Sequence, residues 1–351
     1  MKYTSKMRIP KGIRNRLTGP RAERSELTRV EACFKFIKDE LMVILIWIAS
    51  IKLFVILYRQ LQNVLIGVVR VGPVPRHVSF IMDGNRRYAK GRGMSVKRGH
   101  EAGGLALLNL CYACKNIGIK CVSAYAFSIE NFNRPKEEVD NLYNMFAVKL
   151  DEFAQRANSF KDPLYGARIR IVGDHSLVSQ EMRDKIKNVE KLTKDGADFT
   201  LYICFPYTSR NDIYHTVHDS IEKSLKEKSD LGKFTVSAFT ERMYLDDFSN
   251  KCDLLIRTSG HMRLSDYMLW QSHENSDIQF TSTLWPDFGF IKFYLMLLRW
   301  SFFTSIQRYA DAGFSIREKV ISSIPFLANK KIALDSLPTA PLAVSITGEQ
   351  D

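Results

Sequence analysis

Residues 77–87 read HVSFIMDGNRR, a short apolar run followed at once by a carboxylate, a glycine, an amide and two guanidiniums. The Val, Phe and Ile side chains of the first part favour a buried β-strand over residues 77–82. The polar group begins where that strand would end, and parallel sheets bind ligands beyond the carboxyl ends of their strands. This stretch therefore predicts both a kind of fold and a place for chemistry.

Short β-rich runs and longer helical segments alternate along the rest of the chain. We expect further strands at residues 119–127, 167–172, 199–205, 252–257 and 278–281. Helical segments lie between them, notably 100–117, which Gly118 closes, and 136–156, which Pro135 opens. Such alternation predicts an α/β fold with a six-stranded, mainly parallel sheet flanked by helices.

The polar group after the first strand is Asp83-Gly84-Asn85-Arg86-Arg87. A carboxylate is a hard oxygen ligand for Mg²⁺, which proteins typically hold with one or two carboxylates plus substrate phosphates. Arginine guanidiniums match phosphate oxygens, and a glycine allows close approach of the backbone. The group suits a phosphate-bearing ligand with magnesium. The alternative is a polar turn with solvated arginines.

A second polar cluster, residues 127–135, follows the strand expected at 119–127. Three of its polar side chains could reach one ligand: Ser128, Asn131 and Arg134. Phe127 and Phe132 would supply an apolar wall beside them. A helix-capping loop explains the same residues, so this cluster by itself leaves the choice open.

A third cluster, residues 257–265, reads RTSGHMRLS and follows the strand expected at 252–257. Arg257, Arg263 and hydroxyls that include Ser265 surround a glycine, an arrangement that suits a second anion site. Because the carboxyl ends of parallel strands share one edge of a sheet, three polar clusters at such ends argue against a surface-only role.

The charge of the chain is unevenly distributed. It has 51 Lys and Arg against 38 Asp and Glu, a formal charge of +13. Residues 1–30 hold nine of the cations against Glu23 and Glu26, which gives +7 and leaves +6 for the rest of the chain. A basic excess indicates anionic partners such as nucleic acid, a membrane surface or phosphorylated substrates. The sequence shows no recognition module for nucleic acid, and we expect none to bind.

An apolar stretch, LMVILIWIASIKLFVILY, occupies residues 41–58 and is interrupted only by Ser50 and Lys52. Its length is at the lower limit for a membrane span, and a charge near its centre is costly there. An in-plane membrane helix beside a basic tail fits these features better. A core helix packed on the globular body and a true span remain alternatives.

Six cysteines, mostly in apolar surroundings, show no disulfide pattern, which indicates a reducing compartment. Cys111 and Cys114 form a CxxC pair, but it lies in an apolar helical segment without a second pair. We therefore expect no zinc site there.

Residues 77–87, Gly99-His100, 125–135 and 257–271 together resemble the cis-prenyltransferases, in particular the fungal dehydrodolichyl diphosphate synthase catalytic subunits. The resemblance covers roughly residues 71–310. It implies a hydrophobic tunnel beside the sheet. It also implies Mg²⁺-dependent cis-condensation of many isopentenyl diphosphates onto farnesyl diphosphate. The product would be a long polyprenyl diphosphate, the dolichol precursor for protein glycosylation.

The resemblance also implies roles for individual residues. Asp83 would bind Mg²⁺, and the allylic diphosphate would be held by Gly84, Asn85, Arg86 and Arg87, with His100 near the same site. The second motif would be formed by Phe127, Ser128, Asn131 and Arg134, with Asn131 closest to the reacting carbons. The isopentenyl diphosphate would be held by Arg257, Arg263 and Ser265. Glu138 and Trp270 match positions of structural support. No general base is identified.

Three departures from the family pattern concern activity. Bacterial members carry an Arg where this chain has Val96, beside Lys97 and Arg98, and a metal-contacting Glu near the position of Ser276. Homodimeric members supply a C-terminal Arg-X-Gly to the substrate site, and residues 344–351 contain none. We therefore expect a heteromer with a Nogo-B-receptor-type accessory subunit, and little activity without it.

These features divide the chain into a disordered basic tail (1–30), an apolar membrane-associated helical segment (31–72), a catalytic domain (73–315) and a C-terminal tail (316–351). We expect it on the cytosolic face of the endoplasmic reticulum membrane or on lipid droplets, in contact with membrane lipid. A short-chain cis-prenyl synthase remains an alternative, because tunnel volume cannot be derived from sequence. A non-catalytic accessory subunit is disfavoured by the presence of Asp83. A basic anion-binding protein of the nucleic-acid-binding kind is disfavoured by the lack of a recognition module and by the concentration of half the charge in residues 1–30.

Overall fold

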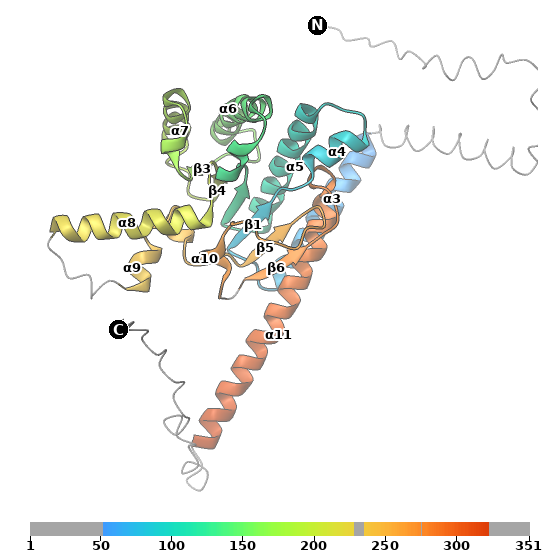
Figure 1. Cartoon of the computed structure of the whole chain (residues 1–351). Helices are drawn as coiled ribbons and strands as arrows, with labels where there is room; N and C mark the ends of the chain where they lie inside the picture. The colour runs from blue at the N-terminus through green and yellow to red at the C-terminus, as the bar shows by residue number, and fades with distance from the viewer. Residues whose placement is uncertain (1–51, 228–234, 275, 323–351) are drawn as a thin grey trace, which may run out of the picture. The chain divides into compact units, whose positions relative to one another are not determined.

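A computed structural model describes the backbone of residues 52–227, 235–274 and 276–322 (Figure 1). The predicted basic tail, most of the apolar stretch 41–58 and most of the C-terminal tail lie outside these residues. The chain divides between Val64 and Leu65 into two units, and the second contains the whole sheet.

The sheet has six strands, all parallel, in the order β3-β4-β2-β1-β5-β6. The strands are β1 (His77–Ile81), β2 (Cys121–Tyr125), β3 (Ala167–Val172), β4 (Phe199–Cys204), β5 (Leu254–Arg257) and β6 (Asp277–Phe280). The predicted six-stranded α/β fold is confirmed, and the strand bounds differ from the expected ones by at most two residues. Strands β2, β4 and β3 lie on one side of β1, and the chain then places β5 and β6 on the other side. This reversal places a switch point, where such sheets bind ligands, at the carboxyl ends of β1 and β5.

The helices are α3 (Lys52–Val71), α4 (Asn85–Gly91), α5 (Val96–Ile117), α6 (Lys136–Asn158), α7 (Gln180–Leu192), α8 (Ser209–Glu227), α9 (Val236–Thr240), α10 (Leu269–Ser272) and α11 (Phe290–Ser322). Helix α5 begins four residues before the predicted start, because the Ser95 side chain accepts a hydrogen bond from Arg98 N at 3.4 Å and caps it there. Gly118 ends it in the left-handed conformation, as expected.

Alternate residues of each strand face opposite sides of the sheet and build two cores. Val78 and Phe80 of β1 belong to the larger core, which includes buried residues of α5, α6, α7 and α11. Ile81 of β1 and Leu255 of β5 belong to the smaller one, which is rich in tyrosine. The five cysteines in the described part of the chain are buried and free, and no cluster of metal-binding type occurs among these residues.

Two glycines of α5 let the short helix α4 pack directly against it. A Cβ on Gly99 would lie 2.5 Å from the Asn85 carbonyl oxygen, and one on Gly103 would clash with the Asn85 side chain. The Gly103 carbonyl also accepts a hydrogen bond from Trp285 Nε1 at 2.8 Å. The close packing fixes Asn85, and with it the start of α4, beside the carboxyl end of β1.

Helix α3 carries a row of exposed apolar side chains: Leu57, Leu61, Val64, Val68 and Val71. Its opposite side buries Ile66 and Val69 in the larger core. Within the described residues, no helix has both the length and the apolar character needed to cross a bilayer.

Candidate active site

The carboxyl ends of β1, β2 and β5 bring the three predicted polar clusters together. Two adjoining cavities lie there, of about 450 and 340 Å³. Every residue predicted for the site lines at least one of them: Asp83, Gly84, Asn85, Arg86, Arg87, His100, Phe127, Ser128, Asn131, Arg134, Arg257, Arg263 and Ser265. Segments as far apart in the sequence as Asp83 and Ser265 thus form one site.

The backbone of Asp83 is fixed between β1 and the segments that follow β5 and β6. Its N–H donates to Thr258 Oγ1 at 3.1 Å, and its carbonyl accepts from the Thr258 hydroxyl at 2.7 Å. The same carbonyl accepts from Trp285 N at 3.0 Å. The Asp83 side chain therefore leaves the sheet from a rigid base.

The two oxygens of the Asp83 carboxylate have different surroundings. Oδ2 is 3.0 Å from Arg257 Nη2 and 2.8 Å from His261 Nδ1. Oδ1 has an arginine, Arg87, at 3.8 Å. Burial raises the pKa of Asp83, but the hydrogen bonds from His261 and Arg257 outweigh it, so the pKa lies below its usual value. The group is thus a carboxylate at neutral pH, and only one of its oxygens, Oδ2, accepts hydrogen bonds from the described residues.

Gly84 turns the chain from β1 into α4. Its φ of 113° lies in the left-handed region that favours glycine, and a Cβ there would lie 3.0 Å from the Leu284 side chain. Both observations explain why the position between the carboxylate and the guanidiniums has no side chain. The turn directs Arg86 and Arg87 into the cavities.

Arg86 and Arg134 come from different clusters and share one carboxylate. Oε1 of Glu138 lies 3.0 Å from Arg134 Nη1 and 3.5 Å from Arg86 Nη1. The carboxylate on α6 holds the two guanidiniums side by side without occupying all of their donors. This geometry agrees with the supporting role predicted for Glu138.

Arg257 is buried at the end of β5 and connects two parts of the site. Nη1 donates to Ser265 Oγ at 2.8 Å and to the Arg263 carbonyl, while Nη2 donates to Asp83. Its Nε is buried without a partner among the described residues. Arg263 and Ser265 themselves are exposed at the rim.

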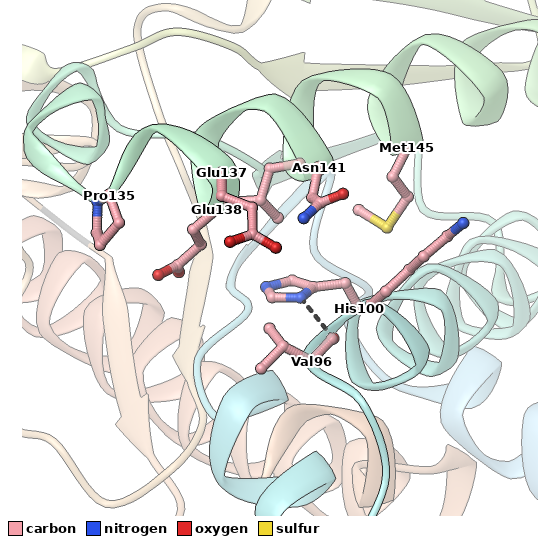
Figure 2. A pocket seen from close by; sticks show the side chains of 9 residues that line it. Val96, His100, Pro135, Glu137, Glu138, Asn141 and Met145 are labelled. Carbon is pink, nitrogen blue, oxygen red and sulfur yellow. Dashed lines mark hydrogen bonds between the residues drawn. The ribbon is translucent and has the colours of Figure 1, made fainter.

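His100 lies on α5, where the charged cavities meet an apolar one. Its Nδ1 donates to the Val96 carbonyl at 2.9 Å, which leaves the Nε2 lone pair as an acceptor. Burial lowers its pKa, so the ring is neutral at pH 7. A further cavity of about 240 Å³ lies beside His100, between α5 and the start of α6. Figure 2 shows the imidazole of His100 on one side of it and Asn141 and Met145 of α6 on the other.

The apolar cavity lies between α5, α6 and the sheet, where the predicted tunnel would be. Its volume is about 90 Å³, and its walls include Leu107, Phe146, Leu150, Phe153 and Phe205. The ring of Phe127 lies 5.2 Å from that of Phe205 and joins this cavity to the second polar cluster. An apolar chain growing from the charged site would enter here, and the walls would have to move apart to hold it.

The charge of the site is strongly positive. Six cations line the two cavities, Arg86, Arg87, Lys90, Arg134, Arg257 and Arg263, against two carboxylates, Asp83 and Glu130. Such an excess suits a ligand with several negative charges. The residues also fit magnesium, since Asp83 offers a hard oxygen beside space for phosphate oxygens, and Mg²⁺ takes one or two carboxylates plus phosphates.

The structure also shows where the departures from the expected family pattern lie. Val96 and Lys97 line the further cavity beside His100, between α5 and the start of α6, and neither lines the two charged cavities. Ser276 lies at the amino end of β6, at the edge of the sheet opposite Asp83, and its hydroxyl donates to the Cys252 carbonyl. Trp270 Nε1 donates to Thr240 Oγ1 at 3.1 Å and ties α10 to α9, in agreement with a supporting role.

Sequence reasoning assigned no role to three residues of the site. Thr258 fixes the Asp83 backbone, His261 contacts its carboxylate, and Lys90 adds a cation one turn after Arg86. His261 belongs to the third cluster, residues 257–265, but only the backbone path of that loop shows where its ring points. Lys90 follows Arg86 by four residues, a helical spacing that could have indicated it.

A six-stranded parallel sheet with a cationic, carboxylate-bearing cleft at its switch point and an apolar cavity behind it suits a ligand that joins several negative charges to an apolar chain. Residues 81–307 match the Prenyltransf family, described as "Putative undecaprenyl diphosphate synthase". The chain belongs to this family, and the prediction of fold, family and enzyme class is confirmed.

Relatives with curated names support the same family. The chain is 59% identical to the dehydrodolichyl diphosphate synthase complex subunit SRT1 of Saccharomyces cerevisiae over 92% of this chain and 94% of that protein. A dehydrodolichyl diphosphate synthase complex subunit of Schizosaccharomyces pombe is 40% identical over 69% of this chain and 90% of its own length. Among solved structures, lavandulyl diphosphate synthase from Lavandula x intermedia, in complex with dimethylallyl diphosphate, matches with a TM-score of 0.59 and 29% identity. That match covers 65% of this chain and 95% of the other.

Proposed function

We propose that this chain is the catalytic subunit of a dehydrodolichyl diphosphate synthase, which adds isopentenyl diphosphates in cis to farnesyl diphosphate in the presence of Mg²⁺. One observation carries the proposal: an ionised carboxylate with one oxygen that accepts no hydrogen bond from the described residues lies among six cations, directly beside an apolar cavity. The names of the relatives support the reaction, and dimethylallyl diphosphate in the related solved structure supports a prenyl diphosphate as ligand.

The arrangement offers two diphosphate subsites. The allylic diphosphate fits beside Asp83, Asn85, Arg86 and Arg87, with its prenyl chain directed past His100 into the apolar cavity. The isopentenyl diphosphate fits beside Arg257, Arg263 and Ser265. Cations fixed before the reaction stabilise charge as it develops, at no cost in reorganisation.

The reaction breaks the allylic C–O bond, and its electron pair leaves with the diphosphate. The π electrons of the isopentenyl double bond form the new C–C bond, and loss of a proton restores a double bond. Asp83 and phosphate oxygens would hold Mg²⁺, which would neutralise charge on the departing diphosphate. Arg86 and Arg87 would stabilise the same charge, while Asn131 and Ser128 lie where the second substrate would meet the first.

A product assay tests this proposal. The full chain is expressed in yeast with a candidate accessory subunit, and farnesyl diphosphate, labelled isopentenyl diphosphate and Mg²⁺ are supplied. Long polyprenyl products that require Mg²⁺ are expected. Label left unincorporated with every partner tried would contradict the proposal. Products of only a few units would instead favour a short-chain synthase, a function that the narrow apolar cavity also suits.

A heteromeric assembly is the second part of the proposal, with a Nogo-B-receptor-type subunit as the partner. The relatives carry "complex subunit" in their names. The rim of the isopentenyl diphosphate subsite is also open to solvent, with Met262 82% exposed beside Arg263. A segment from a partner could cover this rim. Full turnover by the isolated, monodisperse chain would contradict this part.

Membrane contact is the third part of the proposal, at the cytosolic face of the endoplasmic reticulum or at lipid droplets. Helix α3 exposes a row of apolar side chains, and its sequence contains cations but no acidic residue. Such a helix suits an anionic lipid surface. We expect flotation with vesicles that contain phosphatidylserine, and loss of flotation when Leu57, Leu61 and Val64 are changed to Ser. Flotation that the triple variant retains would contradict a role for α3.

A further inference from the structure

The loop after β5 presents a histidine to the Asp83 carboxylate. Ser259 N donates to the Thr283 carbonyl at 2.7 Å, and Gly260 N donates to the Thr281 carbonyl at 2.8 Å. Ser259 has a φ of 83°, a conformation that is uncommon for a residue other than glycine. The loop is therefore held on the segment after β6 in a turn that directs His261 back toward the end of β1.

The contacts of His261 identify its hydrogen-bonding state. Its Nδ1 lies 2.8 Å from Asp83 Oδ2 and 3.3 Å from Arg87 Nη2. One ring nitrogen either donates or accepts, and a carboxylate oxygen can only accept. The shorter contact therefore requires a proton on Nδ1. Arg87 Nη2 has another acceptor, the Ser259 carbonyl at 3.1 Å.

Two donors thus meet on one oxygen of Asp83. Arg257 and His261 both donate to Oδ2, whereas Oδ1 has Arg87 only at 3.8 Å. Arg257 alone cannot fix the carboxylate plane, because its other terminal nitrogen is engaged with Ser265 and the Arg263 carbonyl. The second donor determines which oxygen remains without a hydrogen bond from the described residues.

We propose that His261 is a positioning residue for the metal: its Nδ1–H orients the Asp83 carboxylate so that Oδ1 faces the divalent cation and the allylic diphosphate. This inference rests on the proposed function, since it assumes that Asp83 holds Mg²⁺. A donor that orients a metal-binding carboxylate typically accounts for a factor of about 10–100 in metal affinity. His261 acts through Asp83 and does not itself touch the metal.

The test measures metal binding directly, without turnover. The full chain, purified from yeast with any subunit that accompanies it, is mixed with farnesyl thiolodiphosphate, an unreactive substrate analogue. Free Mn²⁺ is then counted by electron paramagnetic resonance as it is titrated in. We expect His261→Ala to bind Mn²⁺ about 10-fold or more weakly than wild type.

Two further variants test the assigned nitrogen. His261→Asn places an N–H where Nδ1 stands, whereas His261→Gln places it about one bond further out. We expect Asn to bind Mn²⁺ within about 3-fold of wild type and Gln to resemble Ala. Met262→Ala, an exposed neighbour on the same loop, is the matched control and should bind like wild type. Rescue by Gln but not by Asn would overturn the Nδ1 assignment.

Asp83→Ala in the same titration separates the two proposals. If Asp83→Ala loses Mn²⁺ while His261→Ala binds like wild type, the positioning role is wrong and the proposed function stands. If Asp83→Ala also binds like wild type, the metal role of Asp83 fails, and the role of His261 fails with it. In turnover, His261→Ala should raise the Mg²⁺ concentration for half-maximal rate and leave the KM for isopentenyl diphosphate within about 2-fold of wild type. A purely structural change in the loop that carries Arg263 would raise both.

Discussion

Asp83 and Asp253 are carboxylates at opposite ends of neighbouring parallel strands, and they differ in what surrounds them. Asp253 stands just before β5, and its Oδ2 accepts from the backbone N–H groups of Arg76 and His77 at 2.8 and 3.0 Å. Its Oδ1 is 3.4 Å from Lys251 Nζ, and its side chain is 14% exposed. Asp83 accepts only from side chains, is 30% exposed and has one oxygen without a hydrogen bond from the described residues.

The difference separates a structural carboxylate from one available for chemistry. Backbone donors that a carboxylate satisfies are left unpaired when it is removed, so Asp253 serves the fold. The donors to Asp83 both contact Oδ2 and leave Oδ1 without a hydrogen bond, so this carboxylate can still take a ligand. The amino edge of the sheet therefore stabilises the fold, whereas the carboxyl edge can bind a ligand.

Apart from changes to Asp83 itself, the largest effect at the carboxyl edge is expected from Arg257→Lys. An ammonium cannot reach Asp83, Ser265 and the Arg263 carbonyl at once, so the geometry of both subsites is lost. Turnover should fall by a factor of about 10²–10³, while thermal unfolding stays within a few degrees of wild type. Arg168→Lys on the far strand β3 is the control, and the same loss in that variant would contradict the prediction.

The largest effect on stability is expected from Asp253→Ala at the amino edge. Two backbone donors and Lys251 lose their acceptor, which should lower the free energy of unfolding by about 3 kcal/mol. Urea unfolding measures the loss, and Asp195→Ala, at an exposed position, controls for the loss of a charge. Turnover per folded molecule should be unchanged. A stable but inactive Asp253→Ala protein would contradict the comparison.

His77 should make the amino edge sensitive to acid. It is fully buried, with its ring nitrogens 2.9 Å from the Lys251 carbonyl and 2.6 Å from Ser123 Oγ, and burial lowers its pKa to about 4. Between pH 6.5 and 4 the unfolded chain binds a proton that the folded chain does not. Stability is therefore lost as the pH falls through this window, by up to about 3 kcal/mol. Urea unfolding at several pH values should show a smaller slope in His77→Gln, and an unchanged slope would exclude His77 as the cause.

Asp212 should have the opposite effect to His77 on how stability depends on pH. Burial raises its pKa to about 6, although Tyr244 N and the Tyr207 hydroxyl donate to it at 3.1 and 3.2 Å. The folded chain keeps a proton that the unfolded chain releases between pH 3.8 and 6, so stability falls as the pH rises through that window. Asp212→Asn should remove this loss and raise the free energy of unfolding at pH 7.5 by about 1–2 kcal/mol. A less stable Asn variant at that pH would show that the charged form is favoured in the fold.

Much of the carboxyl edge could be predicted from the sequence, because apolar runs indicate the strands and the polar residues follow directly after them. Asp83, Ser128 and Arg257 were placed in this way, and the structure brings them to one cleft. The role of His261 could not be predicted, since it depends on the left-handed turn at Ser259. The start of α5 could not be predicted either, because it depends on the single hydroxyl of Ser95 that caps the helix.

The central claim is that chemistry belongs to Asp83 and stability to Asp253, and one paired measurement tests it most directly. Incorporation of labelled isopentenyl diphosphate is measured for Asp83→Asn and Asp253→Ala in the assembled enzyme, normalised to the folded fraction. We predict that Asp83→Asn is folded and at least about 10³-fold slower than wild type, while Asp253→Ala turns over at the wild-type rate per folded molecule. An active Asp83→Asn enzyme would contradict the account.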